Sequence, residues 1–265
     1  MKIFLSGVVL SVCASAVYAE QPEEIQTTTS PVSANLTFAS QYISRGFQQT
    51  WGKPAIQGGL DYNHASGFFA GTWASNVSSR LIRDASMEWD VYTGYLKTIN
   101  DFTVGATVYY YYYPGAKTTA ETGNTRFNYG EVIPQLGYGP LSVKYAVTYT
   151  PDYFGDNSDT LGGPAGKHSR GSGYLDVNLN QPLRQGWSAI AHYGHMDVKN
   201  FSEANFHDMK LAIAKDLGDG WNTNLAYTKA WDKDNFYKAS SNGNPDAYVS
   251  NPINGTFTIS VNKVF

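Results

Sequence analysis

Apolar and polar residues alternate with a period of two along most of this 265-residue chain. The alternation is plain in FTVGATV at 102–108, in LSVKYAV at 141–147 and in LDVNLN at 175–180. Successive side chains of a β-strand point to opposite faces, so each of these segments would form a strand with one apolar and one polar face. The repeated pattern predicts an all-β protein.

About twelve segments carry this pattern. They lie near residues 34–47, 54–63, 67–77, 86–98, 101–113, 126–139, 140–150, 172–182, 186–197, 205–216, 220–232 and 255–265. Most are as long as a tilted membrane-spanning strand, which needs roughly 9 to 11 residues. Strands of soluble proteins average only about five or six residues. The lengths therefore favour strands that cross a membrane.

The connections between these segments alternate in length. Every second one is tight, at 64–66, 98–101, 139–140, 181–186 and 216–220, whereas polar stretches at 114–125, 151–171 and 233–254 are long. Short periplasmic turns and long outer loops are typical of outer-membrane barrels, and an even strand count places both termini on the turn side. We predict a transmembrane antiparallel up-and-down β-barrel of about twelve strands over residues 34–265.

The N-terminal segment has the features of a secretory signal. Lys2 precedes an apolar run from Ile3 to Val12, and small residues lead to Ala19. We predict a signal peptide at 1–19, because the run is too short for a membrane-spanning helix. Residues 20–33 are acidic and rich in threonine, which predicts a flexible lead-in.

Composition restricts the partners of the predicted barrel. The single cysteine, Cys13, lies in the predicted signal peptide, so the barrel would have no disulfide. The formal net charge of −3 argues against a nucleic-acid partner. We expect no cofactor and no metal. The expected partners are outer-membrane lipid and lipopolysaccharide, the barrel-assembly machinery and small hydrophilic solutes.

Five consecutive tyrosines, Tyr109 to Tyr113, need an environment that suits a large ring and a hydroxyl on both faces of a strand. A strand end at a membrane surface offers this, with lipid headgroups on one side and a polar pore mouth on the other. Aromatic residues predicted to lie at the membrane interface are Trp73, Trp89, Tyr110, Tyr112, Tyr149, Trp187, Trp221 and Tyr227.

The last segment, FTISVNKVF, ends in an aromatic residue and carries its apolar side chains on one face. Phe257, Ile259, Val261 and Phe265 form this face. A closing strand of this kind resembles the assembly signal of bacterial outer-membrane barrels.

If the apolar faces contact lipid, the polar faces line the lumen. The charged residues predicted to line a pore are Arg45, Asp61, Glu88, Asp90, Glu131, Lys144, Asp176, Asp208 and Lys210. Six are acidic and three basic, and charges in a pore bias the passage of ions. We therefore expect a narrow channel with a mild cation preference that passes small hydrophilic solutes. The alternative is that these groups pair across a closed lumen.

Two other functions and one other fold remain open from the sequence. A closed barrel could serve as a structural or adhesin-type surface protein that displays the loops at 151–171 and 233–254. A lipid-modifying enzyme would need a serine and a histidine with an orienting group. His192 and His195 are candidates, but GSG at 171–173 lacks the wider Gly-x-Ser-x-Gly pattern. A soluble barrel or β-sandwich also fits alternation, but it would need acidic groups in its core.

The loop PDYFGDNSD at 151–159 gathers three aspartates that suggest a divalent-cation or lipopolysaccharide contact. Their spacing does not match an EF-hand loop, so solvated carboxylates are the simpler interpretation.

Residues 33–77 resemble the opening of the TorF family of porin-like proteobacterial proteins. The resemblance rests on Ser44-Arg45-Gly46, on PAIQGG at 54–59 and on GTWASNV at 71–77, with TYTPDYFG at 148–155 as a second landmark. It extends over essentially the whole chain after the predicted signal peptide. It implies an outer-membrane pore with no established solute and supplies no catalytic residues.

Overall fold

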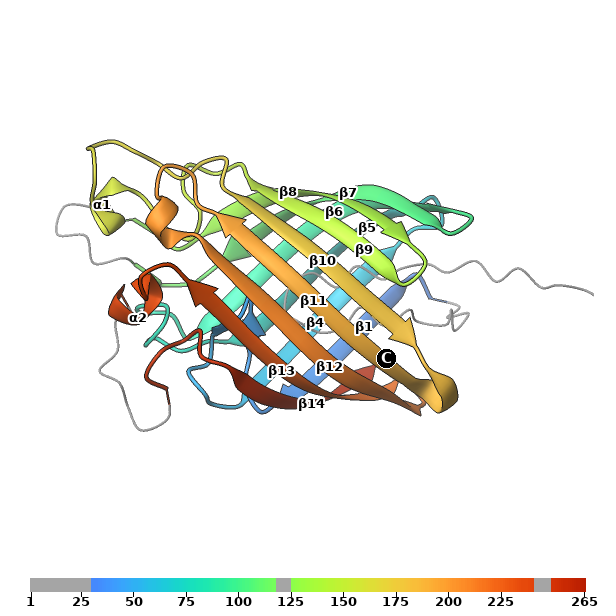
Figure 1. Cartoon of the computed structure of the whole chain (residues 1–265). Coiled ribbons are helices and arrows are strands. Elements are labelled where there is room, and N and C mark those ends of the chain that lie inside the picture. The colour runs from blue at the N-terminus through green and yellow to red at the C-terminus, as the bar shows by residue number, and fades with distance from the viewer. Residues whose placement is uncertain (1–29, 118–124, 241–248) are drawn as a thin grey trace, which may run out of the picture.

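The computed structural model describes residues 30–117, 125–240 and 249–265, which form a closed antiparallel β-barrel (Figure 1). The strands follow one another around the wall in the order β1-β14-β13-β12-β11-β10-β9-β8-β7-β6-β5-β4. This confirms the predicted fold of twelve antiparallel strands. The predicted signal peptide and most of the predicted lead-in lie outside the described residues.

The wall strands are β1 (Val32–Ala39), β4 (Ala55–Asn63), β5 (Phe68–Asn76), β6 (Met87–Ile99), β7 (Phe102–Tyr112), β8 (Tyr129–Tyr138), β9 (Leu141–Thr148), β10 (Gly173–Pro182), β11 (Trp187–Asp197), β12 (Phe206–Gly218), β13 (Trp221–Asp232) and β14 (Thr256–Val264). The remaining elements are short: β2 (Ile43–Ser44), β3 (Phe47–Gln48), α1 (Ser158–Leu161), η1 (Arg184–Gly186), η2 (Ser202–Ala204) and α2 (Phe236–Ser240).

Most strand bounds lie within three residues of those predicted, but the first strand is shorter than expected. β1 ends at Ala39 rather than near residue 47. Residues 40–54 leave the wall, and β2 pairs with β3 in a separate two-stranded sheet. We call residues 40–54 the inserted segment.

The barrel closes between the first and last wall strands. β1 pairs with β14 in a register that joins Asn35 to Val264, and with β4 in a register that joins Thr37 to Gln57. The Phe265 amide donates a hydrogen bond of 2.8 Å to the Ala34 carbonyl, which ties the C-terminus to β1. Because every wall strand has a partner on both sides, the barrel sheet has no open edge.

The two rims of the barrel differ. Tight connections, including those at 100–101, 139–140 and 219–220, lie at one rim, which we call the turn rim. Asn100, Gly139 and Asp219 have positive φ, as tight hairpin turns require. The long connections lie at the opposite loop rim, and the C-terminus is at the turn rim (Figure 1). The C-terminus and the turns are therefore arranged as predicted.

The outer face of the wall is apolar, and the inner face is polar. Outward side chains such as Phe38, Leu60 and Leu136 are 54–64% exposed. Inward carboxylates such as Glu88 and Asp208 are at most 1% exposed. This inside-out distribution suits a barrel whose exterior contacts lipid rather than a soluble barrel. Among the described residues, no helix has the length and apolar character needed to cross a bilayer.

Candidate channel interior

Eight of the nine charged residues predicted to line a pore stand on the wall and face the lumen. They are Asp61 on β4, Glu88 and Asp90 on β6, Glu131 on β8, Lys144 on β9, Asp176 on β10, and Asp208 and Lys210 on β12. Strand alternation places them there, because each occupies the face of its strand opposite to the outward side chains. Whether they line a conducting path remains a prediction.

Arg45, the ninth residue, reaches the lumen by a different route from the one predicted. It belongs to the inserted segment rather than to the wall, at the turn between β2 and β3. Its Nη2 lies 2.6 Å from Glu131 Oε2, and its Nη1 donates a hydrogen bond of 3.1 Å to Glu131 Oε1. The guanidinium also lies 4.2 Å from the ring centroid of Tyr174. The difference lies in the predicted strand 34–47, which ends at Ala39 because the chain turns inward before residue 45.

Five buried carboxylates each accept a hydrogen bond from a tyrosine. The pairs are Tyr92 with Asp61 at 2.5 Å, Tyr42 with Glu88 at 3.2 Å, Tyr109 with Asp90 at 3.0 Å, Tyr111 with Glu131 at 3.1 Å, and Tyr174 with Asp208 at 2.8 Å. A carboxylate that leaves bulk water needs such donors, because an unpaired buried charge is costly. The tyrosines therefore stabilise an acidic interior.

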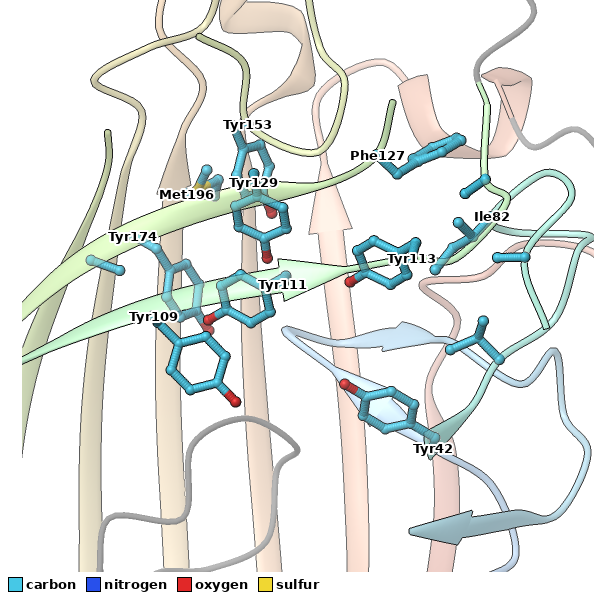
Figure 2. Close-up of a cluster of buried hydrophobic side chains, with 14 of the residues drawn as sticks. Tyr42, Ile82, Tyr109, Tyr111, Tyr113, Phe127, Tyr129, Tyr153, Tyr174 and Met196 are labelled. Carbon is cyan, nitrogen blue, oxygen red and sulfur yellow. The ribbon is translucent and has the colours of Figure 1, made fainter. Parts of the chain in front are cut away.

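The odd-numbered tyrosines of the Tyr109–Tyr113 run stand inside the barrel in a line along β7 (Figure 2). The ring of Tyr109 stacks on Tyr92 with centroids 5.1 Å apart, and Tyr111 stacks on Tyr129 at 4.3 Å. Tyr153 of the loop after β9 packs edge-on against Tyr129 at 5.0 Å. Sequence reasoning expected this split of faces, but it did not identify the tyrosines as partners of the carboxylates.

His192 lies inside the barrel, between two predicted pore residues. Its Nε2 is 2.8 Å from Asp208 Oδ1, and its Nδ1 is 3.0 Å from Asp176 Oδ1. Asn178 donates a hydrogen bond of 2.6 Å to Asp176. Strand alternation places His192 and His195 on opposite faces of β11. His195 indeed lies on the outer face, where its ring stacks on His207 at 4.3 Å.

One sector of the inner wall carries no charge over most of its length. Its strands are β13, β14 and β1, whose inward side chains are mainly amides and hydroxyls: Asn222, Asn224, Thr228, Thr256, Thr258, Ser260, Asn262, Asn35 and Thr37. Several, including Asn224, Thr258 and Asn262, are only half-buried. We call this surface the neutral wall. It differs from the inner face of β4–β7, which bears Asp61, Glu88 and Asp90 and no inward lysine or arginine.

Seven of the eight aromatic residues predicted at the interface stand on the outer face: Trp89, Tyr110, Tyr112, Tyr149, Trp187, Trp221 and Tyr227. Trp73 does not. It is 6% exposed, pairs in register with the inward Asp90, and packs edge-on against Tyr42 at 5.4 Å. The expectation for Trp73 is corrected, because position 73 shares its face with the inward Ser75 rather than with the outward Phe68.

The predicted C-terminal signal residues all point outward. Phe257, Ile259, Val261 and Phe265 are 71, 56, 37 and 67% exposed. They lie on the outer face of β14 and just beyond its end, with Lys263 on the same face between Val261 and Phe265. Their role in assembly remains a prediction.

The aspartates of the loop after β9 are not grouped to hold a metal ion. Asp152 accepts from His168 at 2.7 Å and from Asn157 at 2.8 Å, so it organises the loop. Asp159 lies in the first turn of α1 and is exposed. In the described part of the chain, no three His, Cys, Asp or Glu side chains are grouped to hold a metal ion.

Comparison with solved structures shows that porins share this fold. The KdgM porin superposes with a TM-score of 0.51 at 9% identity, over 88% of this chain and 99% of the porin, and so does the KdgM porin in complex with disordered oligogalacturonate. The NanC porin gives a TM-score of 0.48 at 9% identity, over 88% of this chain and 98% of the other. No curated protein matches by sequence.

A family model described as "Bacterial protein of unknown function (Gcw_chp)" matches residues 24–265. The match covers the whole barrel, whereas the TorF resemblance stays a prediction. The chain therefore belongs to the Gcw_chp family of bacterial proteins of unknown function.

Proposed function

We propose that this protein is a channel in the bacterial outer membrane that lets small hydrophilic solutes or ions cross by passive diffusion. The observation that carries the proposal is the closed barrel itself, apolar outside and lined with charges, amides and hydroxyls inside. Such an interior is favourable where water fills the barrel. The porin fold of KdgM supports the proposal. Passive diffusion needs neither a catalytic residue nor a cofactor.

The solute path in this proposal runs along the neutral wall. Near the loop rim the inserted segment and the tyrosine cluster occupy the lumen beside β6–β8, where Glu131 and Asp90 are fully buried. There the segment also packs against Ala230 on β13 and donates a hydrogen bond to Thr256 on β14. The neutral wall keeps short, half-buried side chains such as Asn224 and Thr258. Amides and hydroxyls can exchange hydrogen bonds with a passing solute and with water. Small polar solutes are therefore the expected cargo.

A mild preference for cations is part of the proposal. All charged side chains on the inner face of β4–β7 are acidic, whereas Arg45 is neutralised by Glu131 across the lumen. A solved porin of this fold is in complex with disordered oligogalacturonate. For this chain we expect neutral or cationic solutes to pass more readily than carboxylated ones, because the wall carboxylates repel like charge.

The outer surface supports the membrane location. The outward aromatic residues include Trp89 and Tyr112 near the loop rim and Trp187 and Trp221 near the turn rim. Two such belts fit the two headgroup layers of a bilayer. Lipid, lipopolysaccharide and the barrel-assembly machinery are the partners we propose, the last through the β14 face that ends at Phe265.

A closed barrel that only displays its loops is the second candidate. The observation in its favour is that the inserted segment crosses the lumen and shields Glu131 and Asp208 from solvent. Single-channel recording of refolded protein in a planar bilayer, with a salt gradient, separates the two candidates. The channel proposal predicts stable conductance steps and a reversal potential of cation-selective sign. Silence from folded, inserted protein would favour the closed barrel.

Deletion of the loop at 151–171 sharpens the comparison. A channel keeps or increases its conductance when this loop is removed. A display protein loses binding to its surface ligand and stays silent.

A further inference from the structure

The inserted segment forms a narrow hairpin inside the barrel. Ile43 pairs with Gln48 and Ser44 with Phe47, so Arg45 and Gly46 form a two-residue turn. Both have positive φ, 47° and 81°, as a type I′ turn requires. The tip of the hairpin is therefore a tight, defined turn.

The base of this hairpin is tied to the loop rim. The Gln49 amide donates to the Tyr42 carbonyl at 2.9 Å, the Ser78 amide to the Gln49 carbonyl at 2.8 Å, and the Gln48 amide to the Pro252 carbonyl at 2.9 Å. Trp51, also in the segment, is fully buried. These bonds hold the base in place while its tip projects into the lumen.

The tip reaches the far wall. The segment leaves from the β1–β4 seam, whereas Glu131 and Tyr174 stand on β8 and β10, on the opposite side of the strand order. On the way, Gly46 packs so closely on β12 and β13 that a Cβ there would lie 2.8 Å from Asp208 Cβ and 2.5 Å from Ala230 Cβ. The hairpin therefore bridges the lumen from wall to wall.

The tip of the hairpin contacts the far wall through one ion pair, between Arg45 and Glu131. Arg45 and Glu131 form a bidentate pair, and their side chains are 14% and 0% exposed. The Tyr174 ring covers the guanidinium at 4.2 Å, and Tyr111 donates to Glu131 at 3.1 Å. Bidentate geometry fixes the position of the guanidinium as well as its charge, and shielding from water strengthens the attraction. The pair is thus built to hold the tip at one place.

We infer that the Arg45–Glu131 ion pair is a latch that holds residues 40–54 across the lumen and so sets the size limit for solutes. The inference rests on the proposed channel function. With the latch closed, a solute must pass beside the hairpin to reach the half-buried part of the neutral wall around Asn224 and Thr258. With the latch released, the tip can swing away from β8 and the free cross-section grows.

The test compares Arg45→Ala and Glu131→Gln with Asp197→Asn, each refolded and shown to be folded by its electrophoretic mobility before and after heating. Asp197 is the control, because its exposed carboxylate accepts a hydrogen bond from Asn205 and lies on the same face of β11 as the outward Tyr193. Single-channel conductance and liposome swelling with neutral sugars of increasing size are measured. Both latch variants should raise conductance by at least about twofold and admit larger sugars, whereas the control keeps the wild-type size limit.

A charge-swapped double variant, Arg45→Glu with Glu131→Arg, checks that the effect comes from the pair. Partial return towards wild-type conductance supports the latch, and conductance no lower than in the single variants counts against it. Conduction that is equal in wild type and both single variants refutes the latch and leaves the channel function standing. Silence from wild type with conduction in both variants supports a latch that closes the pore fully. Silence from every folded variant refutes both the latch and the channel.

Discussion

Gly46→Ala is the substitution whose effect follows most directly from the packing of the hairpin tip. Gly46 has φ +81°, where an L-residue other than glycine is strained by about 1–2 kcal/mol. The new methyl group would also lie 2.5 Å from Ala230 Cβ, well inside van der Waals contact. Overpacking of this kind costs about 1–3 kcal/mol. The two contributions together lower the free energy of unfolding by about 2–5 kcal/mol.

Gly166→Ala provides the matched control. Gly166 has φ +75°, but a Cβ there meets nothing within 4 Å. The Gly166→Ala variant should lose only the backbone contribution to the free energy of unfolding, about 1–2 kcal/mol. Guanidinium unfolding in detergent micelles, followed by tryptophan fluorescence, measures both losses, and Trp51 in the inserted segment is a buried reporter. An equal loss for the two variants would refute the close contact between the hairpin tip and the wall.

Three further predictions concern charge, lipid contact and pH. Replacing Asp176 and Asp208 together with asparagine should reduce cation preference, and an unchanged reversal potential in a conducting channel would exclude them from the path. In single-tryptophan variants, brominated lipid should quench Trp89, which is 47% exposed, and not Trp73; strong quenching of Trp73 would contradict its inward position. Burial and the neighbouring carboxylates of Asp152 and Glu203 raise the pKa of Asp156 in the loop after β9. Because a raised folded-state pKa destabilises the ionised form, the penalty is absent below the unfolded value of about 3.9 and grows as pH rises above it. Asp156→Asn should therefore raise the unfolding temperature at pH 7 and leave it unchanged at pH 3, and the same gain at both pH values would contradict this.

The strands of the barrel wall were predictable because successive side chains point alternately to the outer and the inner face. LDVNLN at 175–180 must turn Asp176 and Asn178 to one side and the leucines to the other, whichever neighbours the strand has. The predicted segment 172–182 accordingly differs from β10 by one residue. The alternation of short and long connections indicated which rim carries the turns and which the loops. The closed barrel could therefore be predicted without knowledge of any tertiary contact.

The inserted segment was not predictable from alternation. Tyr42 has the same parity as the apolar Leu36 and Phe38, so alternation does not mark the end of β1 at Ala39. Each strand of the hairpin has only two residues, too few to show a period. Gly46 next to Arg45 was the one local signal, since glycine within a strand pattern marks a turn or bulge. The partner of Arg45 depends on how far the hairpin reaches, which only the folded barrel determines.

Trp73 shows why aromatic residues could not be assigned to a face by type. In FFAGTWASN both faces of β5 carry an aromatic ring, so hydrophobicity does not distinguish lipid from lumen. A lumen filled by tyrosines accepts tryptophan as readily as lipid does. The tyrosine partners of the carboxylates were missed for a related reason, because those pairs depend on register between strands rather than on sequence spacing.

The most direct test of the central claim is chemical modification of a single cysteine on the neutral wall. Thr258→Cys places a thiol inside the barrel on β14, and Phe257→Cys places one on the outer face of the same strand, where the native side chain is 71% exposed. A charged, membrane-impermeant methanethiosulfonate reagent is added during single-channel recording. The account predicts a stepwise fall in conductance for the cysteine at 258 and no change for the cysteine at 257. Steady conductance at 258, with modification of that thiol verified by mass, would contradict a solute path along the neutral wall.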